Sequence, residues 1–148
     1  MFKLPTNERL SRWKSFRASL DDLPLGEAVR QTNDFWHSCP FIPFYLDESV
    51  ENWPDPWQLI EENYYCELAK ALGIVYTLHL SKHQQNLDPE IRIYYDEKTK
   101  YTYHIVYLCD GKYVLNMVEG EVVNKDLIDK ELILKHRYTA EDMKLEKY

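Results

Sequence analysis

The spacing of apolar residues changes once along this chain, near residue 90, and this change constrains the fold more than any other feature. Up to His83, apolar side chains recur every three to four residues, which is the period of an amphipathic helix. From Ile91 they alternate with polar side chains, which is typical of half-buried strands. Helices followed by antiparallel strands predict an α+β fold. At 148 residues we expect a single domain (1–148), mainly helical at 1–83, with an antiparallel sheet at 91–123 and a tail at 125–148.

Three helical stretches are predicted in the first half. The first carries its apolar stripe from Leu10 to Leu20, and the second runs from about Leu25 to His37. The third begins with Asp55 as N-cap and Pro56 at the first helical position, and keeps its period to Leu78. Residues 63–66 mark a break or a new N-terminus within it.

The second half predicts a small meander followed by a tail. Strands are expected at 91–95, 101–108 and 112–118, with a turn at 96–100, and residues 121–123 could extend the sheet. The tail at 125–135 has a weak helical pattern. The predicted core joins both halves through eight side chains: Trp13, Trp36, Trp57, Leu68, Leu72, Val75, Ile105 and Leu115.

Charge and composition exclude several classes of protein. The chain has 18 Lys and Arg against 25 Asp and Glu, a net charge of −7 without a basic stripe, so we expect no nucleic-acid partner. No apolar run is long enough to span a membrane, and the polar N-terminus does not resemble a signal peptide, so we expect a cytoplasmic protein. The three cysteines are odd in number and lack CxxC spacing, which indicates free thiols.

One set of residues could carry chemistry: Cys66, His104 and Asn116. A thiol acts as a nucleophile when it is held as a thiolate, which a helix N-terminus and a nearby imidazole both favour. Cys66 lies where a helix could begin, and His104 and Asn116 lie on consecutive strands. A third polar group orients the imidazole, and Asn116 could have that role. The thiol sulfur would then lie within about 4 Å of a ring nitrogen of His104 and would open to a cleft.

Whether His104 and Asn116 meet depends on the turn between their strands. A two-residue turn at Asp110-Gly111 pairs His104 with Met117 and places Asn116 on the other face. A three-residue loop at 109–111, with Gly111 left-handed, pairs His104 directly with Asn116. We favour the second register because it separates polar from apolar side chains better.

The order of this trio resembles the transglutaminase-like branch of the papain-type fold. Three segments carry the resemblance: Asn63-Tyr64-Tyr65-Cys66-Glu67-Leu68-Ala69, residues 101–107 around His104, and residues 110–116, which end at Asn116. The resemblance covers roughly 55–118 and is one of order rather than of long identity. It implies a papain-type thiol enzyme that cleaves or transfers amide bonds with a Cys-His-Asn triad. The aromatic-rich composition also resembles small accessory proteins of tailed bacteriophages, which would place the chain in a virion or in the host cytoplasm.

Several residues depart from the family pattern. The family has a glycine just ahead of its cysteine, where this chain has Tyr64 and Tyr65, and a Trp two residues after its histidine, where this chain has Val106. The helix after Cys66 reaches Gly73 early. We therefore favour slightly a non-catalytic transglutaminase-like domain with a protein partner and an interaction or virion-associated structural role, and keep the thiol enzyme as the alternative. Neither interpretation requires a cofactor.

Two other patterns have simpler explanations. His79 and His83 are four residues apart, as zinc ligands often are, but no third ligand is evident, so we interpret them as a solvated pair at a helix end. The Trp53-Pro54-Asp55-Pro56-Trp57 segment could be a ligand platform, and packing of both indoles onto a helix start is the stronger interpretation.

Overall fold

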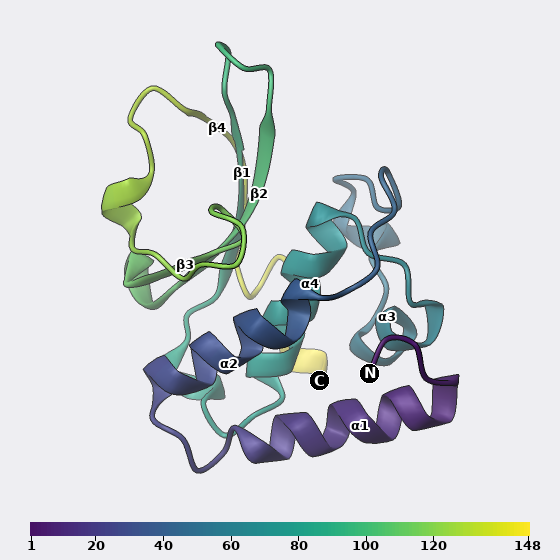
Figure 1. Cartoon of the computed structure of the whole chain (residues 1–148). Coiled ribbons are helices and arrows are strands. Elements are labelled where there is room, and N and C mark those ends of the chain that lie inside the picture. The colour runs from purple at the N-terminus through teal and green to yellow at the C-terminus, as the bar shows by residue number, and fades with distance from the viewer.

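The computed structural model describes all of residues 1–148, as four α-helices and one antiparallel sheet. The helices are α1 (Thr6–Ser19), α2 (Leu25–His37), α3 (Pro56–Glu62) and α4 (Glu67–His79). The strands are β1 (Glu90–Tyr95), β2 (Thr102–Leu108), β3 (Tyr113–Leu115) and β4 (Ile133–Tyr138), in the order β3-β2-β1-β4. Figure 1 shows the sheet on one side of α4 and the other helices around it. No helix has the length and apolar character needed to cross a membrane.

The boundaries of α3 and α4 follow local sequence signals. Asp55 caps α3, because its carboxylate accepts the Gln58 N–H while the Gln58 side chain accepts the Asp55 N–H. Asn63 ends α3 in the left-handed conformation, with φ 57°. The break expected at residues 63–66 is therefore a true end, and α4 is a separate helix that continues through Gly73 to His79.

Helix α4 is the centre of the core. Its side chains are buried nearly all round, because α2 and α3 cover one side and β2 covers another. The Thr77 hydroxyl accepts the indole N–H groups of Trp13 and Trp36 at 2.9 and 3.0 Å and donates to the Gly73 carbonyl at 2.6 Å. This single hydroxyl therefore satisfies both buried indoles and links three helices.

Seven of the eight predicted core side chains are buried. Trp57 is the exception, since it is 42% exposed and its ring lies edge to face against that of Tyr148. The sheet buries residues on both faces. Val106 and Leu108 join the core against α4, whereas Ile105 and Tyr107 form a small second cluster on the opposite face.

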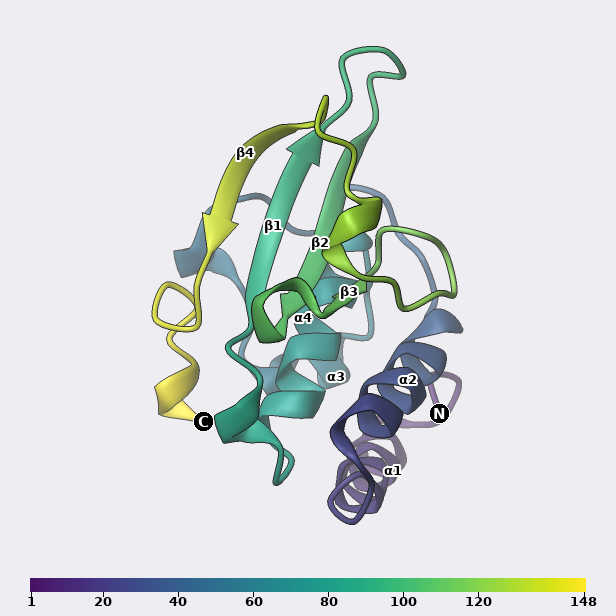
Figure 2. The same cartoon turned by 90° about the vertical axis from the view of Figure 1, so that its left-hand side faces the viewer.

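The prediction for the tail was wrong. Residues 125–127 form a short 3₁₀ turn, and the chain then returns as β4, which pairs with β1 in Figure 2. The sheet therefore extends beyond residue 123. Because β4 is an edge strand with mostly exposed side chains, it lacks the alternating apolar pattern by which strands are recognised.

Candidate functional site

Cys66 lies at the N-cap of α4, in extended backbone geometry with φ −84° and ψ 179°. The first main-chain bond of the helix runs from the Lys70 N–H to the Cys66 carbonyl at 2.9 Å, so the amides of residues 67–69 have no partner within the helix. These amides and the helix dipole favour negative charge at this end. The side chain is 6% exposed and contributes to the wall of a cavity.

The two tyrosines ahead of Cys66 point away from each other. Tyr65 is fully buried, with its ring against Phe2 and Trp36, and its main-chain carbonyl accepts the Ile42 N–H at 3.0 Å. Tyr64 is about half exposed and packs on Tyr45. The bulky residues at the glycine position of the family pattern therefore leave the thiol in contact with the cavity.

His104 lies on β2 and points to the α4 side of the sheet, on the same face as Val106. Its Nδ1 is buried and has no hydrogen-bond partner. Burial lowers the pKa of His104, and the negative charge of Glu48 opposes that shift. The imidazole is therefore neutral at pH 7 and can accept a proton. No hydrogen bond joins it to Cys66.

Asn116 contacts main-chain atoms and not the imidazole ring. Its Nδ2 donates to the His104 carbonyl at 2.7 Å and to the Glu67 carbonyl at 3.1 Å. This amide therefore ties β2 to the first residue of α4, next to Cys66.

The favoured strand register was wrong. Val106 pairs with Leu115 and Leu108 with Tyr113, which is the register that brings His104 opposite Met117. Gly111 is left-handed as expected, with φ 85°, but Cys109 and Asp110 are left-handed too, and the loop spans 109–112. Asn116 still reaches the site because β3 ends at Leu115 and Asn116 itself has φ 67°, which turns its side chain toward α4.

A cavity of about 380 Å³ borders the thiol. Cys66 and Asn116 line it together with Cys39 and Phe41 from the segment after α2, whereas His104 is not among its lining residues. Burial raises the pKa of Cys39 to about 11, so that thiol is protonated at neutral pH.

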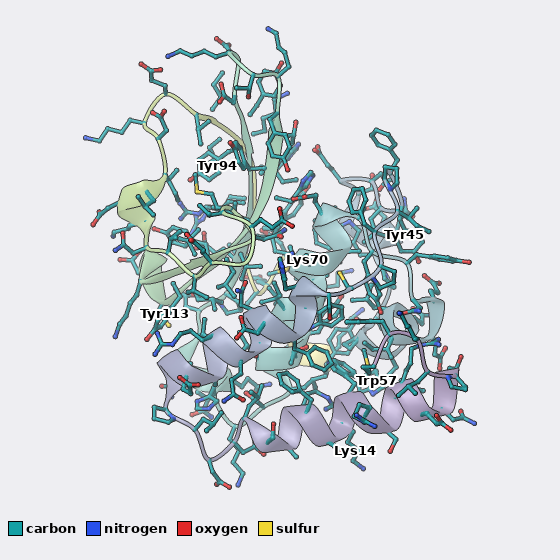
Figure 3. All side chains as sticks on the ribbon, viewed as in Figure 1. Lys14, Tyr45, Trp57, Lys70, Tyr94 and Tyr113 are labelled. Carbon is teal, nitrogen blue, oxygen red and sulfur yellow. The ribbon has the colours of Figure 1, made fainter.

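The cavity also contains charges of both signs. Lys70 and Glu67 reach it from α4, and Glu119 reaches it from the segment after β3 (Figure 3 labels Lys70). Burial raises the pKa of Glu67, and the nearby Lys70 ammonium opposes the shift. Lys70 makes no ion pair, so its charge is available to a molecule in the cavity.

His79 and His83 do not share a site; each ring contacts a different group. A ring nitrogen of His83 lies 2.8 Å from the Leu20 carbonyl, and the His79 ring lies against the Gln84 amide. No group of three His, Cys, Asp or Glu side chains could hold a metal ion.

Comparison with solved structures identifies the fold. The chain superposes on calcium-bound LapG of Legionella pneumophila with a TM-score of 0.74 at 15% identity, covering 94% of this chain and 78% of LapG. The EGTA-treated LapG structure gives 0.71 at 14% identity, covering 91% and 74%. The fold is transglutaminase-like. No protein-family model and no curated protein sequence matches the chain. The likeness to LapG gives no support to the resemblance to bacteriophage proteins.

The residues around the thiol do not fit the calcium ion that one LapG structure contains. Calcium takes roughly six to eight oxygen ligands, most of them from carboxylates and carbonyls. Here Glu67 and Glu119 share the cavity with the Lys70 ammonium, which opposes a second cation, and they do not form part of a three-ligand group.

Proposed function

We propose that this chain is a thiol enzyme acting on amide bonds, with Cys66 as the nucleophile and His104 as the base. The observation that carries the proposal is the placement of Cys66 at the N-terminus of α4, where it borders a cavity. The Asn116 amide joins the neighbouring Glu67 to the main chain of His104, whose Nδ1 is buried and has no partner. The two tyrosines that favoured a non-catalytic domain in the sequence do not separate Cys66 from the cavity, which it lines while being only 6% exposed.

The reaction follows from these positions. The neutral His104 accepts the thiol proton, and the Cys66 sulfur attacks the amide carbonyl. The unpaired amides of residues 67–69 face the charge that develops on the carbonyl oxygen. His104 then returns the proton to the leaving amine, and a thioester on Cys66 remains. Water or a second amine resolves the thioester, giving hydrolysis or transfer.

The resting site must close for this chemistry. No hydrogen bond links the thiol and the imidazole in this structure, so the proposal requires the two groups to come together when substrate binds. Catalytic hydrogen bonds are often long in the absence of substrate, so this geometry is compatible with activity.

Cysteine alkylation tests the proposal without a known substrate. At pH 6 we expect iodoacetamide to modify Cys66 at least tenfold faster than Cys39 or Cys109, measured by mass spectrometry of the peptides, because burial raises the pKa of both other thiols. His104→Gln should remove the excess reactivity of Cys66. Equal, slow labelling of the three thiols would count against the enzyme.

A second candidate is a non-catalytic protein-binding domain. The observation that favours it is a set of exposed apolar side chains between α2 and α3, including Phe41 (64% exposed) and Phe44 (98% exposed). Exposed aromatic side chains that lie close together are typical of interaction sites. Under this candidate Cys66 is inert, so the alkylation experiment separates the two.

A further inference from the structure

An exposed apolar surface adjoins the cavity that contains the thiol. We call Phe41, Phe44, Tyr45 and Tyr64 the apolar platform. Phe41 is 64% exposed and Phe44 is 98% exposed, while the rings of Tyr45 (labelled in Figure 3) and Tyr64 pack together with their centroids 5.6 Å apart. Because Phe41 also lines the cavity beside Cys66, the platform and the cavity are continuous.

Phe44 is held in an unfavourable conformation. Its φ is 63°, in the left-handed region that bulky residues rarely adopt, and its ring is almost completely exposed. The backbone strain therefore has no compensation from burial of the ring within this chain. Strained residues of this kind cluster where a protein holds a ligand.

Main-chain contacts fix the platform relative to the nucleophile. Phe41 pairs with Tyr65 in a short parallel bridge, and the Ile42 N–H donates to the Tyr65 carbonyl at 3.0 Å. Paired strands lie about 4.8 Å apart, and Tyr65 directly precedes Cys66. A polypeptide that lies on the platform is therefore held next to the thiol.

The region around the platform is acidic. Residues 31–69 contain eight Asp and Glu and no Lys or Arg, so they account for the whole negative charge of the chain. Glu61 and Glu62 end α3 just ahead of Tyr64, and both are exposed and make no ion pair. Asp47 follows the platform in sequence, and its carboxylate accepts only a main-chain N–H. These carboxylates are free to meet cations of a bound molecule.

Few cations of this chain reach the same region. Arg9 reaches the end of α3, but its guanidinium is buried and donates to main-chain carbonyls there at 2.9 and 3.1 Å. Lys3 is exposed in the N-terminal segment, whose Phe2 carbonyl accepts the Asn63 amide at 2.9 Å. Lys70 lines the cavity. The exposed carboxylates outnumber these cations, so the border of the platform is negative.

We propose that the apolar platform binds a polypeptide segment with apolar and basic side chains, and that this segment adjoins the amide bond that Cys66 attacks. The inference rests on the proposed function, of which it names the substrate class. Apolar side chains of the segment pack on Phe41 and Phe44, and its Lys or Arg side chains pair with Glu61 and Glu62. A second copy of this chain is a poorer occupant, because two acidic borders would repel each other.

Peptide binding to the full-length Cys66→Ala variant tests the platform without turnover. The probes are three short labelled peptides, measured by fluorescence anisotropy: one of leucine, lysine and serine, one with glutamate in place of lysine, and one with serine in place of leucine. We expect the leucine–lysine peptide to bind about tenfold or more tighter than either other peptide.

Matched substitutions locate the binding site. Phe44→Ser and the double variant Glu61→Gln/Glu62→Gln should each weaken binding of the leucine–lysine peptide about fivefold. Two controls should not change it. Leu127→Ser removes another exposed apolar side chain, and Glu97→Gln/Glu141→Gln removes two exposed carboxylates outside the platform.

The wild-type protein connects the platform to the thiol. Saturating leucine–lysine peptide should slow iodoacetamide labelling of Cys66 about threefold or more and leave labelling of Cys109 unchanged, because the bound segment covers the cavity. Binding without this protection would overturn the substrate role.

The remaining outcomes separate this inference from the proposed function. Equal binding of the lysine and glutamate peptides, or no effect of Phe44→Ser, would overturn the platform and leave a fast-reacting Cys66 as support for the enzyme. A dimer in sedimentation that Phe44→Ser dissociates would show that a second copy occupies the platform, and would also overturn the inference. A Cys66 that reacts no faster than Cys109 would overturn the enzyme and the substrate class with it.

Discussion

The Asn116 side-chain amide donates to the main-chain carbonyl of His104 at 2.7 Å, and this contact positions the site without touching the imidazole ring. The same nitrogen donates to the Glu67 carbonyl at 3.1 Å. Because both partners are acceptors, the position requires a donor, which an aspartate cannot supply. Asn116 therefore links β2 to α4 through two main-chain carbonyls. In a papain-type triad, by contrast, the acidic or amide residue hydrogen-bonds to the histidine ring itself.

Asn116→Asp should destabilise the protein and slow Cys66 alkylation. The carboxylate loses two hydrogen bonds and faces two carbonyl oxygens, so we expect a loss of about 2 kcal/mol in the free energy of unfolding, measured by urea denaturation. Asn116→Gly is the matched control, because glycine keeps the left-handed backbone at φ 67° and adds no charge, and it should cost about 1 kcal/mol. If Asn116→Asp instead preserved or raised the rate of Cys66 alkylation, residue 116 would act on the imidazole ring, and its assignment as a link between two main-chain carbonyls would be wrong.

Gly73→Ala should destabilise the core strongly. A Cβ at this position would lie 2.5 Å from the Trp36 ring, and the ring cannot withdraw because its N–H is bound to Thr77. We expect a loss of about 2–3 kcal/mol in the free energy of unfolding, although alanine is the better helix former. Gly26→Ala in α2 is the control, since its Cβ would meet only the end of the Tyr113 side chain at 2.9 Å. Equal effects of the two substitutions in thermal unfolding would show that the Trp36 contact is not tight.

The sequence predicted well the parts of the fold that depend on local signals. The bounds of α2 agree with the apolar period from Leu25 to His37, and the start of α3 follows from Asp55 and Pro56. Each of these signals acts over a few neighbouring residues, through a cap, a fixed φ or a buried face. The placement of Cys66 at a helix N-terminus was predictable for the same reason.

The sequence could not predict features that depend on tertiary contacts. The three consecutive left-handed residues at 109–111 include Cys109, whose residue type gives no signal for positive φ, and they shift the strand register. β4 pairs with the edge of β1 that β2 leaves open. The side chains of β4 are mostly exposed, so its sequence lacks the alternating apolar pattern of a strand. His136 of β4, which pairs with the same Ile93 as His104 does, was missed because no spacing in the sequence connects the two histidines.

Glu90→Gln should lower the free energy of unfolding at neutral pH and have little effect on it in acid. Glu90 is buried on the outer face of the sheet, where Arg137 donates to both carboxylate oxygens at 2.7 and 2.6 Å and Arg92 donates at 2.8 Å. Hydrogen bonds from Arg137 lower the pKa of Glu90 below its ordinary value of 4.5. A carboxyl whose pKa is lower in the folded state contributes stability above its ordinary pKa, and this contribution is lost as the pH falls through the lower value.

We therefore expect Glu90→Gln to cost about 2 kcal/mol at pH 7, with the difference from wild type shrinking toward pH 3 in chemical denaturation. Glu131→Gln is the control, because the Glu131–Lys98 pair is similarly short but exposed, and it should change the free energy of unfolding by less than about 0.5 kcal/mol. A difference that does not depend on pH would show that the loss comes from packing rather than from the charge of Glu90.

Lys70→Met should change which reagents reach the thiol. Lys70 is the lysine that lines the cavity beside Cys66, and without it Glu67 and Glu119 leave the cavity negative. One unit charge at close range in water is worth about 1 kcal/mol, or roughly fivefold in rate. We therefore expect the rate of Cys66 modification by the anionic iodoacetate, relative to the neutral iodoacetamide, to fall about fivefold in Lys70→Met.

Lys14→Met removes a lysine of α1 that does not line this cavity, and it should leave the ratio unchanged. The difference should shrink in 1 M salt, where charges are screened beyond about 3 Å. An unchanged ratio at low salt would show that the ammonium does not act at the thiol, and that this cavity does not select its ligands by charge.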